Sequence, residues 1–303
     1  MTSGWVSKIA HASWEDGPGL RTVVFLSGCN LRCQWCHNPE SIPRNGQLMY
    51  YADKCIGCGE CASVCSCHAI EGNRHLWDGR QCMRCGKCAD ACLGEALQLS
   101  ARQMEPGQVF SQILRDKAYY RDNGGVTFSG GECLLQPEFL LAVLSECKRH
   151  GIHTCIETAL HVDFSTVAPL LEWIDLVIAD IKLIDPVRHK QYTGADNRQI
   201  LENIRRIAAL GKDLRLRVPL IPGVTDTDEN LDGIADFVAS LPASGAISVE
   251  LLRYNSLADS KYRSIGREYH DFGQPQSTEE IQHMLRRLSV RQPAVSFFYA
   301  PLT

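Results

Sequence analysis

Three cysteines, Cys29, Cys33 and Cys36, form a CxxxCxxC pattern directly after a short apolar segment. Closely spaced thiolates are typical ligands of iron–sulfur clusters, and a cluster of four irons needs four protein ligands to be closed. With three ligands, one iron keeps an open coordination position, and such a position distinguishes a chemically active metal site from a structural one. The spacing therefore predicts a reactive cluster at these cysteines.

Two later segments share the pattern CxxCxxCxxxC: Cys55, Cys58, Cys61 and Cys65, and then Cys82, Cys85, Cys88 and Cys92. In bacterial ferredoxins with this spacing, the fourth cysteine of each run ligates the other cluster. We therefore expect two closed 4Fe-4S clusters, one held by Cys55, Cys58, Cys61 and Cys92, the other by Cys82, Cys85, Cys88 and Cys65. The alternative is a zinc ribbon, which binds through pairs of CxxC, and two complete runs disfavour it.

The two runs depart from the ferredoxin pattern at the position after the fourth cysteine, where proline is replaced by Ser66 and by Leu93. Because proline is not a ligand, we expect cluster binding to survive. Cys67 is either a substitute ligand or a bystander packed near a cluster.

Composition narrows the class of protein. The 303 residues carry a net charge of -4 and no basic run, which argues against a nucleic-acid partner. The N-terminus lacks the apolar core of a signal peptide and no stretch approaches membrane-spanning length, so we expect a cytoplasmic protein without a membrane partner. Fifteen cysteines in such a chain favour metal ligation over disulfides. We expect a monomer.

Short apolar segments alternate with helical patterns along the chain. Strands are expected at 22–26, 126–129, 153–158, 176–181, 214–219 and 247–252. Helical patterns cover about 109–121, 137–151, 163–172, 198–210, 228–240 and 278–290, before an apolar tail at 294–298. Such alternation implies βαβ units and a parallel sheet. We predict an α/β fold, a partial (β/α)6 TIM-type barrel of residues 1–48 and 101–303, with a small ferredoxin-like insert at 49–100.

Polar or metal-binding residues follow every predicted strand. After the cysteine triplet these are Ser129-Gly130-Gly131-Glu132, Glu157-Thr158, Asp180 with Lys182, Arg217, and Arg253-Tyr254-Asn255. Because the active site of an α/β barrel lies at the carboxyl ends of its strands, we expect them to converge on one mouth.

Several of these residues have two interpretations. The glycine pair either lets the backbone approach a ligand or forms a tight turn. Asp180 and Lys182 lie on one face of their strand and form either a binding pair or an internal ion pair. Arg217 is a candidate anion contact.

The triplet together with Gly130-Gly131-Glu132 resembles the radical S-adenosylmethionine (SAM) superfamily. Further segments resemble the glycyl-radical-enzyme activating enzymes, in the subgroup with a two-cluster ferredoxin-like insert. These segments are Asp16–Arg21, Trp35–Asn38, Arg217–Gly223, Leu251–Asn255 and Lys261-Tyr262. The resemblance covers essentially the whole chain.

The resemblance implies roles for individual residues. The open iron would chelate the amino and carboxylate groups of SAM, Trp35 would lie near the adenine, and Gly130, Gly131 and Glu132 would hold the amino group. Asp180 would contact the ribose and Lys182 the carboxylate.

Two positions differ from the family. Glu157 and Thr158 correspond to an Asp-Thr pair that helps to form a monovalent-cation site beside SAM. Asn255 replaces a histidine that contacts the nucleoside.

The resemblance also implies the reaction. A reduced cluster would cleave SAM to methionine and a 5′-deoxyadenosyl radical, which would take a hydrogen from a backbone glycine of a partner glycyl radical enzyme. The insert would relay electrons from a flavodoxin or ferredoxin, or shape the docking surface. Two other hypotheses are a radical SAM enzyme that acts on a small molecule and an iron–sulfur electron carrier without catalysis.

Overall fold

The computed structural model describes residues 2–72, 74–242 and 244–300. Its largest sheet has nine strands in the order β13-β12-β11-β10-β9-β8-β2-β1-β7. The six strands expected from the sequence are its parallel centre: β2 (Arg21–Leu26), β8 (Gly125–Gly130), β9 (His153–Thr158), β10 (Leu176–Asp180), β11 (Asp213–Leu220) and β12 (Ile247–Arg253). The prediction of an α/β fold with a mostly parallel sheet is confirmed.

The remaining strands lie at the two edges of this sheet. β1 (Gly4–Ser13) and β7 (Arg102–Met104) are antiparallel, and β13 (Ser296–Phe298) pairs parallel with β12. None of the three was expected, because β1 mixes polar with apolar residues and the other two are only three residues long. In the described part of the chain, β7 and β13 are not paired with each other. The sheet is therefore open, as a partial barrel requires.

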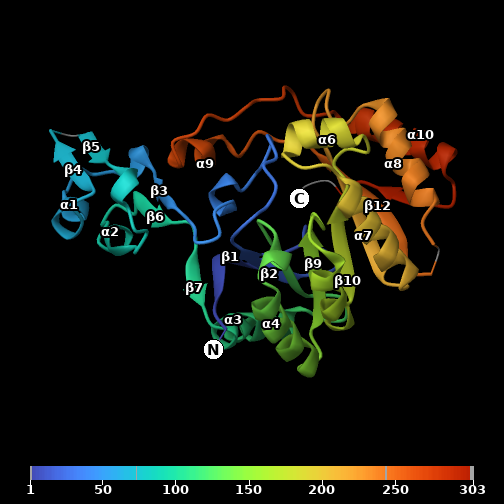
Figure 1. Ribbon diagram of the computed structural model, residues 1–303, viewed down its shortest axis with the longest axis horizontal. Coiled ribbons are helices and arrows are strands. Elements are labelled where there is room, and N and C mark those ends of the chain that lie inside the picture. The colour runs from blue at the N-terminus through green and yellow to red at the C-terminus, as the bar shows by residue number, and fades with distance from the viewer. Residues whose placement is uncertain (1, 73, 243, 301–303) are drawn as a thin grey trace.

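Helices cross between the parallel strands and cover one face of the sheet (Figure 1). They are α3 (Pro106–Asp116), α4 (Pro137–Arg149), α5 (Phe164–Val167), α7 (Arg198–Ala209), α8 (Asp228–Ala239) and α10 (Thr278–Arg291). The helix expected at 163–172 is shorter, because Pro169 lacks a backbone donor and the chain continues from Ala168 as a 3-10 helix. Two short helices were missed, α6 (Pro186–Thr193) and α9 (Asp259–Ser264). No described helix has both the length and the apolar character needed to cross a membrane.

Alternation along the strands separates an apolar face from a polar one. Leu214, Leu216 and Val218 of β11 are buried in the core that also contains residues of α4 and α7. Arg215 and Arg217, at the intervening positions, form ion pairs with Glu250 of β12. The interior of the partial barrel is thus lined by charged side chains, while the apolar core lies between the sheet and the helices.

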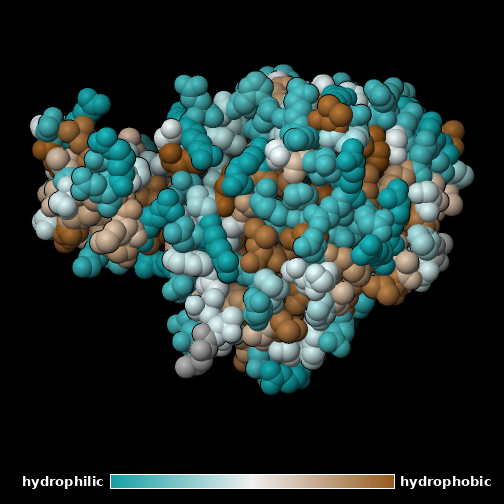
Figure 2. All heavy atoms as spheres, viewed as in Figure 1, coloured by the Kyte–Doolittle hydropathy of each residue, from teal (hydrophilic) through white to brown (hydrophobic). Residues whose placement is uncertain are grey.

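The cysteine-rich segment forms a lobe that projects from the barrel, at the left in Figures 1 and 2. Its strands β3 (Leu48–Tyr50) and β6 (Leu97–Leu99) pair with each other, and β4 (His68–Glu71) pairs with β5 (Arg74–Trp77). Between them lie two short helices, α1 (Glu60–Val64) and α2 (Lys87–Asp90). The hydrophobic core of this lobe contains four buried residues, Leu48, Cys61, Cys88 and Leu97. A segment with so few apolar residues in its core normally depends on a metal or a disulfide.

We predict that Gly130→Ala destabilises the fold. Gly130 has a φ of +117°, and an added Cβ would lie 2.2 Å from the carbonyl oxygen of Leu26. Both the strained backbone and the clash should lower the unfolding free energy by about 2 kcal/mol or more, as measured by anaerobic chemical denaturation. The matched control is Gly107→Ala in α3, where nothing lies within 4 Å of the added carbon. An equal effect of the two substitutions would contradict this explanation.

Candidate active site

The cysteine triplet follows β2 in a loop that backbone hydrogen bonds hold from two sides. On one side, the amides of Gly28 and Cys29 donate to the carbonyl oxygens of Ser41 and Ile42, at 2.7 and 3.0 Å. On the other, the amides of Arg32 and Gln34 donate to Thr193 and Tyr192 at the end of α6, at 2.7 and 3.0 Å. The positions of the three cysteines are therefore set by the main chain.

The three thiols share a buried environment. Burial raises the pKa of Cys33 to about 11 and that of Cys36 to about 12, and repulsion from the neighbouring thiols contributes in both cases. The positive charge of Lys182 opposes this effect at Cys29 and Cys33. Bound metal deprotonates such thiols and removes the cost of their ionisation. Three partly buried cysteines that raise one another's pKa, beside a buried cation, therefore fit a three-thiolate cluster.

Lys182 and Asp180 form the internal ion pair that the sequence left as an alternative, with Nζ and Oδ2 2.5 Å apart. Lys182 is only 7% exposed. Although burial alone would lower the pKa of Lys182, the negative charges of Asp180 and of the Cys33 and Cys29 thiolates raise it above its ordinary value. Lys182 therefore stays charged and lies between the carboxylate and the cysteine triplet.

Gly130 and Gly131 bring the end of β8 against the cysteine loop. The amide of Gly131 donates to Leu26, and the amide of Glu132 donates to Gly28 at 2.7 Å. A Cβ on Gly131 would lie 2.3 Å from the carbonyl oxygen of Gly28. Close packing thus explains the glycine pair, because side chains at these two positions would push the segment away from Cys29.

Glu132 is fully buried and held by the neighbouring strand end. Its Oε1 accepts hydrogen bonds from the Thr158 hydroxyl at 2.7 Å and from the Leu134 amide at 3.1 Å. Its Oε2 accepts one from the amide of Ala159, at 2.9 Å. Burial raises the pKa of Glu132 despite these donors. The result is a fixed carboxylate next to the triplet, placed by residues that follow β8 and β9.

Arg217 lies between two carboxylates inside the barrel. Its guanidinium pairs with Glu157 of β9 and, at 2.9 Å, with Glu250 of β12. Burial raises the pKa of the Glu157 carboxyl, but the charge of Arg217 and the hydrogen bonds from Ser129 and Arg217 together outweigh it, so the pKa is lowered. The second oxygen of Glu157 accepts from the Ser129 hydroxyl at 2.6 Å. Arg217 and Glu157 thus satisfy each other, whereas the sequence suggested an anion for the first and a monovalent cation for the second.

The loop between β1 and β2 is attached to this charged interior. Arg217 donates to the carbonyl oxygen of Glu15, and Arg21 donates to that of Pro18 at 2.8 Å. Asp16, next to Glu15, has its pKa raised to about 6 by burial and by the negative charge of Glu157. These contacts give the segment Asp16–Arg21 a structural role. Its arginine and the neighbouring backbone attach the loop between β1 and β2 to the charged interior of the barrel.

Trp35 and Asn255 have partners within the chain. Trp35 is buried, with its ring 6.1 Å from that of Tyr192 and 6.0 Å from that of Phe272. The Asn255 side chain accepts from the amide of Leu257 at 3.2 Å, so it shapes the turn after β12. The carbonyl oxygen of Asn255 is 3.1 Å from Nε2 of His37 in the cysteine loop. Their expected contacts with the adenine and the nucleoside stay predictions.

Lys261 is a residue whose role sequence reasoning missed. It lies on α9 and pairs with Glu40 at 3.1 Å. It also donates to Oδ1 of Asn38 at 2.5 Å and to the carbonyl oxygen of His37. The sequence signal is the segment Lys261-Tyr262, which resembles the family, but spacing alone does not connect it to residues more than 200 positions earlier.

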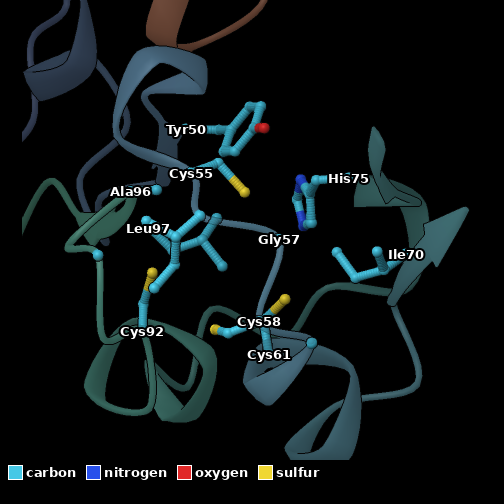
Figure 3. Close-up of a pocket in the computed structure, with 13 residues that line it drawn as sticks. Tyr50, Cys55, Gly57, Cys58, Cys61, Ile70, His75, Cys92, Ala96 and Leu97 are labelled. Atoms are coloured by element: carbon cyan, nitrogen blue, oxygen red, sulfur yellow. The ribbon is translucent and has the colours of Figure 1, made fainter. Parts of the chain in front are cut away.

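The two predicted sets of cysteines in the insert differ in their surroundings, because the first set lines a pocket. Cys55, Cys58, Cys61 and Cys92 line one pocket, together with Tyr50 and His75 (Figure 3). In the second set, Cys65 and Cys82 raise the pKa of Cys88 by their proximity, and Cys85 is exposed. Cys67 lies beside Cys65 and Cys82. All fifteen cysteines are free.

Comparison with known proteins gives one family and a consistent group of relatives. Residues 23–238 match the family model of the radical SAM superfamily. The chain is 39% identical to the indoleacetate decarboxylase activating enzyme of Tractidigestivibacter scatoligenes, over 91% of this chain and 91% of that protein. It is 38% identical to the (2S)-3-sulfopropanediol dehydratase activating enzyme of Klebsiella oxytoca, over 88% of this chain and 86% of that protein.

Among solved structures, a spore photoproduct lyase is similar in fold. Its TM-score is 0.51 at 12% identity, and the match covers 97% of this chain and 79% of that one. At that identity, the match supports the fold alone.

We predict that Arg217→Met strongly destabilises the protein at neutral pH. The substitution leaves Glu157 without its cation and leaves Glu250 with only its longer pair to Arg215, at 3.8 Å, which should cost about 3–5 kcal/mol of unfolding free energy. Arg149→Met is the control, because it breaks an exposed pair with Glu146 and should cost less than about 1 kcal/mol. Chemical denaturation of both variants tests this. Similar losses in the two would show that Arg217 is not needed to compensate the buried charges.

Asp16 should make stability depend on pH. Its folded pKa of about 6 lies above the ordinary value of 3.8, so the folded state binds the proton more tightly and loses stability as pH rises between these values. Asp16→Asn removes this effect, and its unfolding free energy relative to the unsubstituted protein should rise from pH 4 to pH 7. Asp122→Asn, at an exposed position, is the control. A constant difference across this range would refute the pKa assignment.

Proposed function

The chain belongs to the radical SAM superfamily and, within it, to the glycyl-radical-enzyme activating enzymes, and from this we propose how its residues generate a radical on a protein partner. The observation that carries the proposal is the geometry of Cys29, Cys33 and Cys36 beside Lys182 and Glu132. Relatives over about nine-tenths of the chain are named activating enzymes, at 34% to 39% identity.

The cysteine triplet would hold the 4Fe-4S cluster that the family implies, with one iron open to SAM. When bound, the cluster and SAM supply a 5′-deoxyadenosyl radical, which takes hydrogen from a backbone glycine of the partner. The partly buried positions of the thiols would limit the access of water to the cluster, and the main-chain hydrogen bonds of their loop would fix its orientation. Lys182 contributes a positive charge that compensates the thiolates.

Glu132, Lys182 and Asp180 are the polar groups that would orient SAM. Oε2 of Glu132 accepts one hydrogen bond from the described residues, which leaves it able to accept another from an amino group. Lys182 would attract the SAM carboxylate. Its ammonium group would then interact with two carboxylates, that of SAM and that of Asp180. A trapped monovalent cation beside Glu157 and Thr158 stays a prediction, since the Arg217 guanidinium already supplies a cation to Glu157.

The open sheet suits a protein substrate. Because β7 and β13 leave the barrel unclosed within the described residues, a glycine-bearing loop can reach the strand ends from outside. A closed eight-stranded barrel would admit only what fits through its mouth. The partner is thus a glycyl radical enzyme, and which one it is depends on the surface around this mouth.

The insert would bind two further 4Fe-4S clusters as an electron relay. Support comes from the pocket that Cys55, Cys58, Cys61 and Cys92 line together, and from the small apolar core of the lobe. With the triplet, this makes three clusters per chain. A flavodoxin or ferredoxin would deliver electrons to the exposed side of the lobe, and the activating enzyme would act as a monomer.

The direct test is anaerobic reconstitution of the full chain with a reductant, SAM and a candidate glycyl radical enzyme. We expect 5′-deoxyadenosine to form and a glycyl radical to appear on the partner by electron paramagnetic resonance (EPR). A modified small molecule without any partner radical would instead support a small-molecule radical SAM enzyme. No SAM cleavage with about twelve irons bound would refute both activities.

Cys36→Ala should abolish SAM cleavage and leave the insert loaded. We expect the iron content to fall by about four per chain, because one of the three thiolate ligands of the open cluster is lost. Iron and sulfide analysis measures the loading, and chromatography of 5′-deoxyadenosine measures the cleavage. Cys147→Ala is the control, since that thiol is buried in the apolar core away from both sites. Cleavage that persists in Cys36→Ala would overturn the ligand assignment.

A further inference from the structure

Two histidines of the insert form a hydrogen-bonded pair that the radical chemistry does not use. Nδ1 of His68 lies 2.9 Å from Nε2 of His75, and the two rings stack with their centroids 5.1 Å apart. On its other side, the ring of His75 is 4.5 Å from that of Tyr50. These are the only histidines between residues 49 and 100 of the sequence. The ring of His75 is therefore packed between the rings of Tyr50 and His68, which holds the histidine pair in place.

The two histidines together carry one N–H group more than the hydrogen bond between them uses. Two neutral imidazoles carry two N–H groups, and one of them lies between the rings. His68 is only 6% exposed, and its Nε2 has no hydrogen-bond partner among the described residues. A buried polar group without a hydrogen-bond partner costs about 1–3 kcal/mol, so this nitrogen calls for an acceptor close by.

The sulfur of Cys61 is a candidate acceptor. One ring nitrogen of each histidine and Sγ of Cys61 all lie within 4.8 Å of one another. His75 also lines the pocket that Cys55, Cys58, Cys61 and Cys92 surround (Figure 3). The histidine pair therefore lies against one of the two predicted cluster sites of the insert.

We propose that the His68–His75 pair donates an N–H hydrogen bond to the Cys61 sulfur of this insert cluster and thereby raises its reduction potential. The inference rests on the proposed cluster at Cys55, Cys58, Cys61 and Cys92. Reduction adds negative charge to the cluster and its sulfur ligands, so a donor stabilises the reduced form more than the oxidised form. The proposed bond goes to a cysteine of the first set alone, so it makes the two insert clusters differ in potential.

A single metal ion held by Cys61, His68 and His75 is the competing arrangement. Two nitrogens bound to one tetrahedral zinc at ~2.05 Å lie about 3.3 Å apart, whereas the observed separation of 2.9 Å is that of a hydrogen bond. Cys61 also has three cysteine neighbours in the pocket. The geometry thus favours the donor pair over a zinc site.

The test is an EPR-monitored redox titration of the reconstituted full chain and of His75→Phe and His68→Phe. Phenylalanine keeps a ring for stacking but removes the nitrogens. At the midpoint potential of the unsubstituted protein, we expect the reduced-to-oxidised ratio of one insert cluster to fall roughly tenfold, or ~59 mV for one electron. His283→Phe, at an exposed site on α10, is the control and should shift no cluster.

Several outcomes would overturn the inference. Unchanged potentials of all clusters at full iron loading would show that the pair does not act on the cluster. If the insert of the unsubstituted protein contained zinc, or no iron, the proposed cluster would be absent and the inference would fail with it.

Loss of about four irons in both phenylalanine variants would show that the histidines are ligands or supports instead. Pulsed EPR of the unsubstituted protein decides the matter without any variant, since the donor pair predicts nitrogen and exchangeable-proton couplings to one reduced insert cluster. SAM cleavage with a partner is measured in parallel. Its failure with normal insert potentials would count against the proposed function and not against the histidine pair.

Discussion

A guanidinium buried inside the barrel is the interaction on which the mouth of the site depends. Arg217 connects Glu157, Glu250 and the carbonyl oxygen of Glu15, and so joins strands β9, β11 and β12 to the loop that precedes β2. Buried charges are costly when unpaired, and this constraint forces the three strand ends and the loop into one relative arrangement. A core of apolar side chains would tolerate small shifts that this network does not.

The reactive end of the barrel is then assembled mostly from main-chain contacts. The segment after β8 donates to Leu26 and Gly28, and the cysteine loop donates to Ser41 and to the end of α6. Side-chain charge enters at one point, where Lys182 lies between Asp180 and the thiols. Backbone hydrogen bonds therefore define the positions of the cysteine loop and of the segment after β8, and the buried cation Lys182 sets the electrostatic environment of the thiols.

Much of the architecture could be predicted from the sequence, because the parallel strands are short segments rich in apolar residues that alternate regularly with helical patterns. The edge strands β1 and β7 could not, since partly exposed strands mix polar and apolar residues. At the site, cysteine spacing and strand ends singled out the candidate residues. The partners within it were not predictable, because Arg217 with Glu157 and Lys261 with Glu40 meet only in three dimensions. The ion pair of Asp180 with Lys182 was foreseen as one of two possibilities, since alternation puts both on one side of a strand.

The way in which the cysteine loop is held has a consequence for divergence among related proteins. Every residue type except proline carries the same amide and carbonyl groups, so these main-chain bonds do not depend on which side chains lie between the cysteines. Arg32 and Gln34, whose amides anchor the loop, are exposed. Surfaces beside the reactive centre can therefore be remodelled to fit new partners while the chemistry at their centre is inherited unchanged.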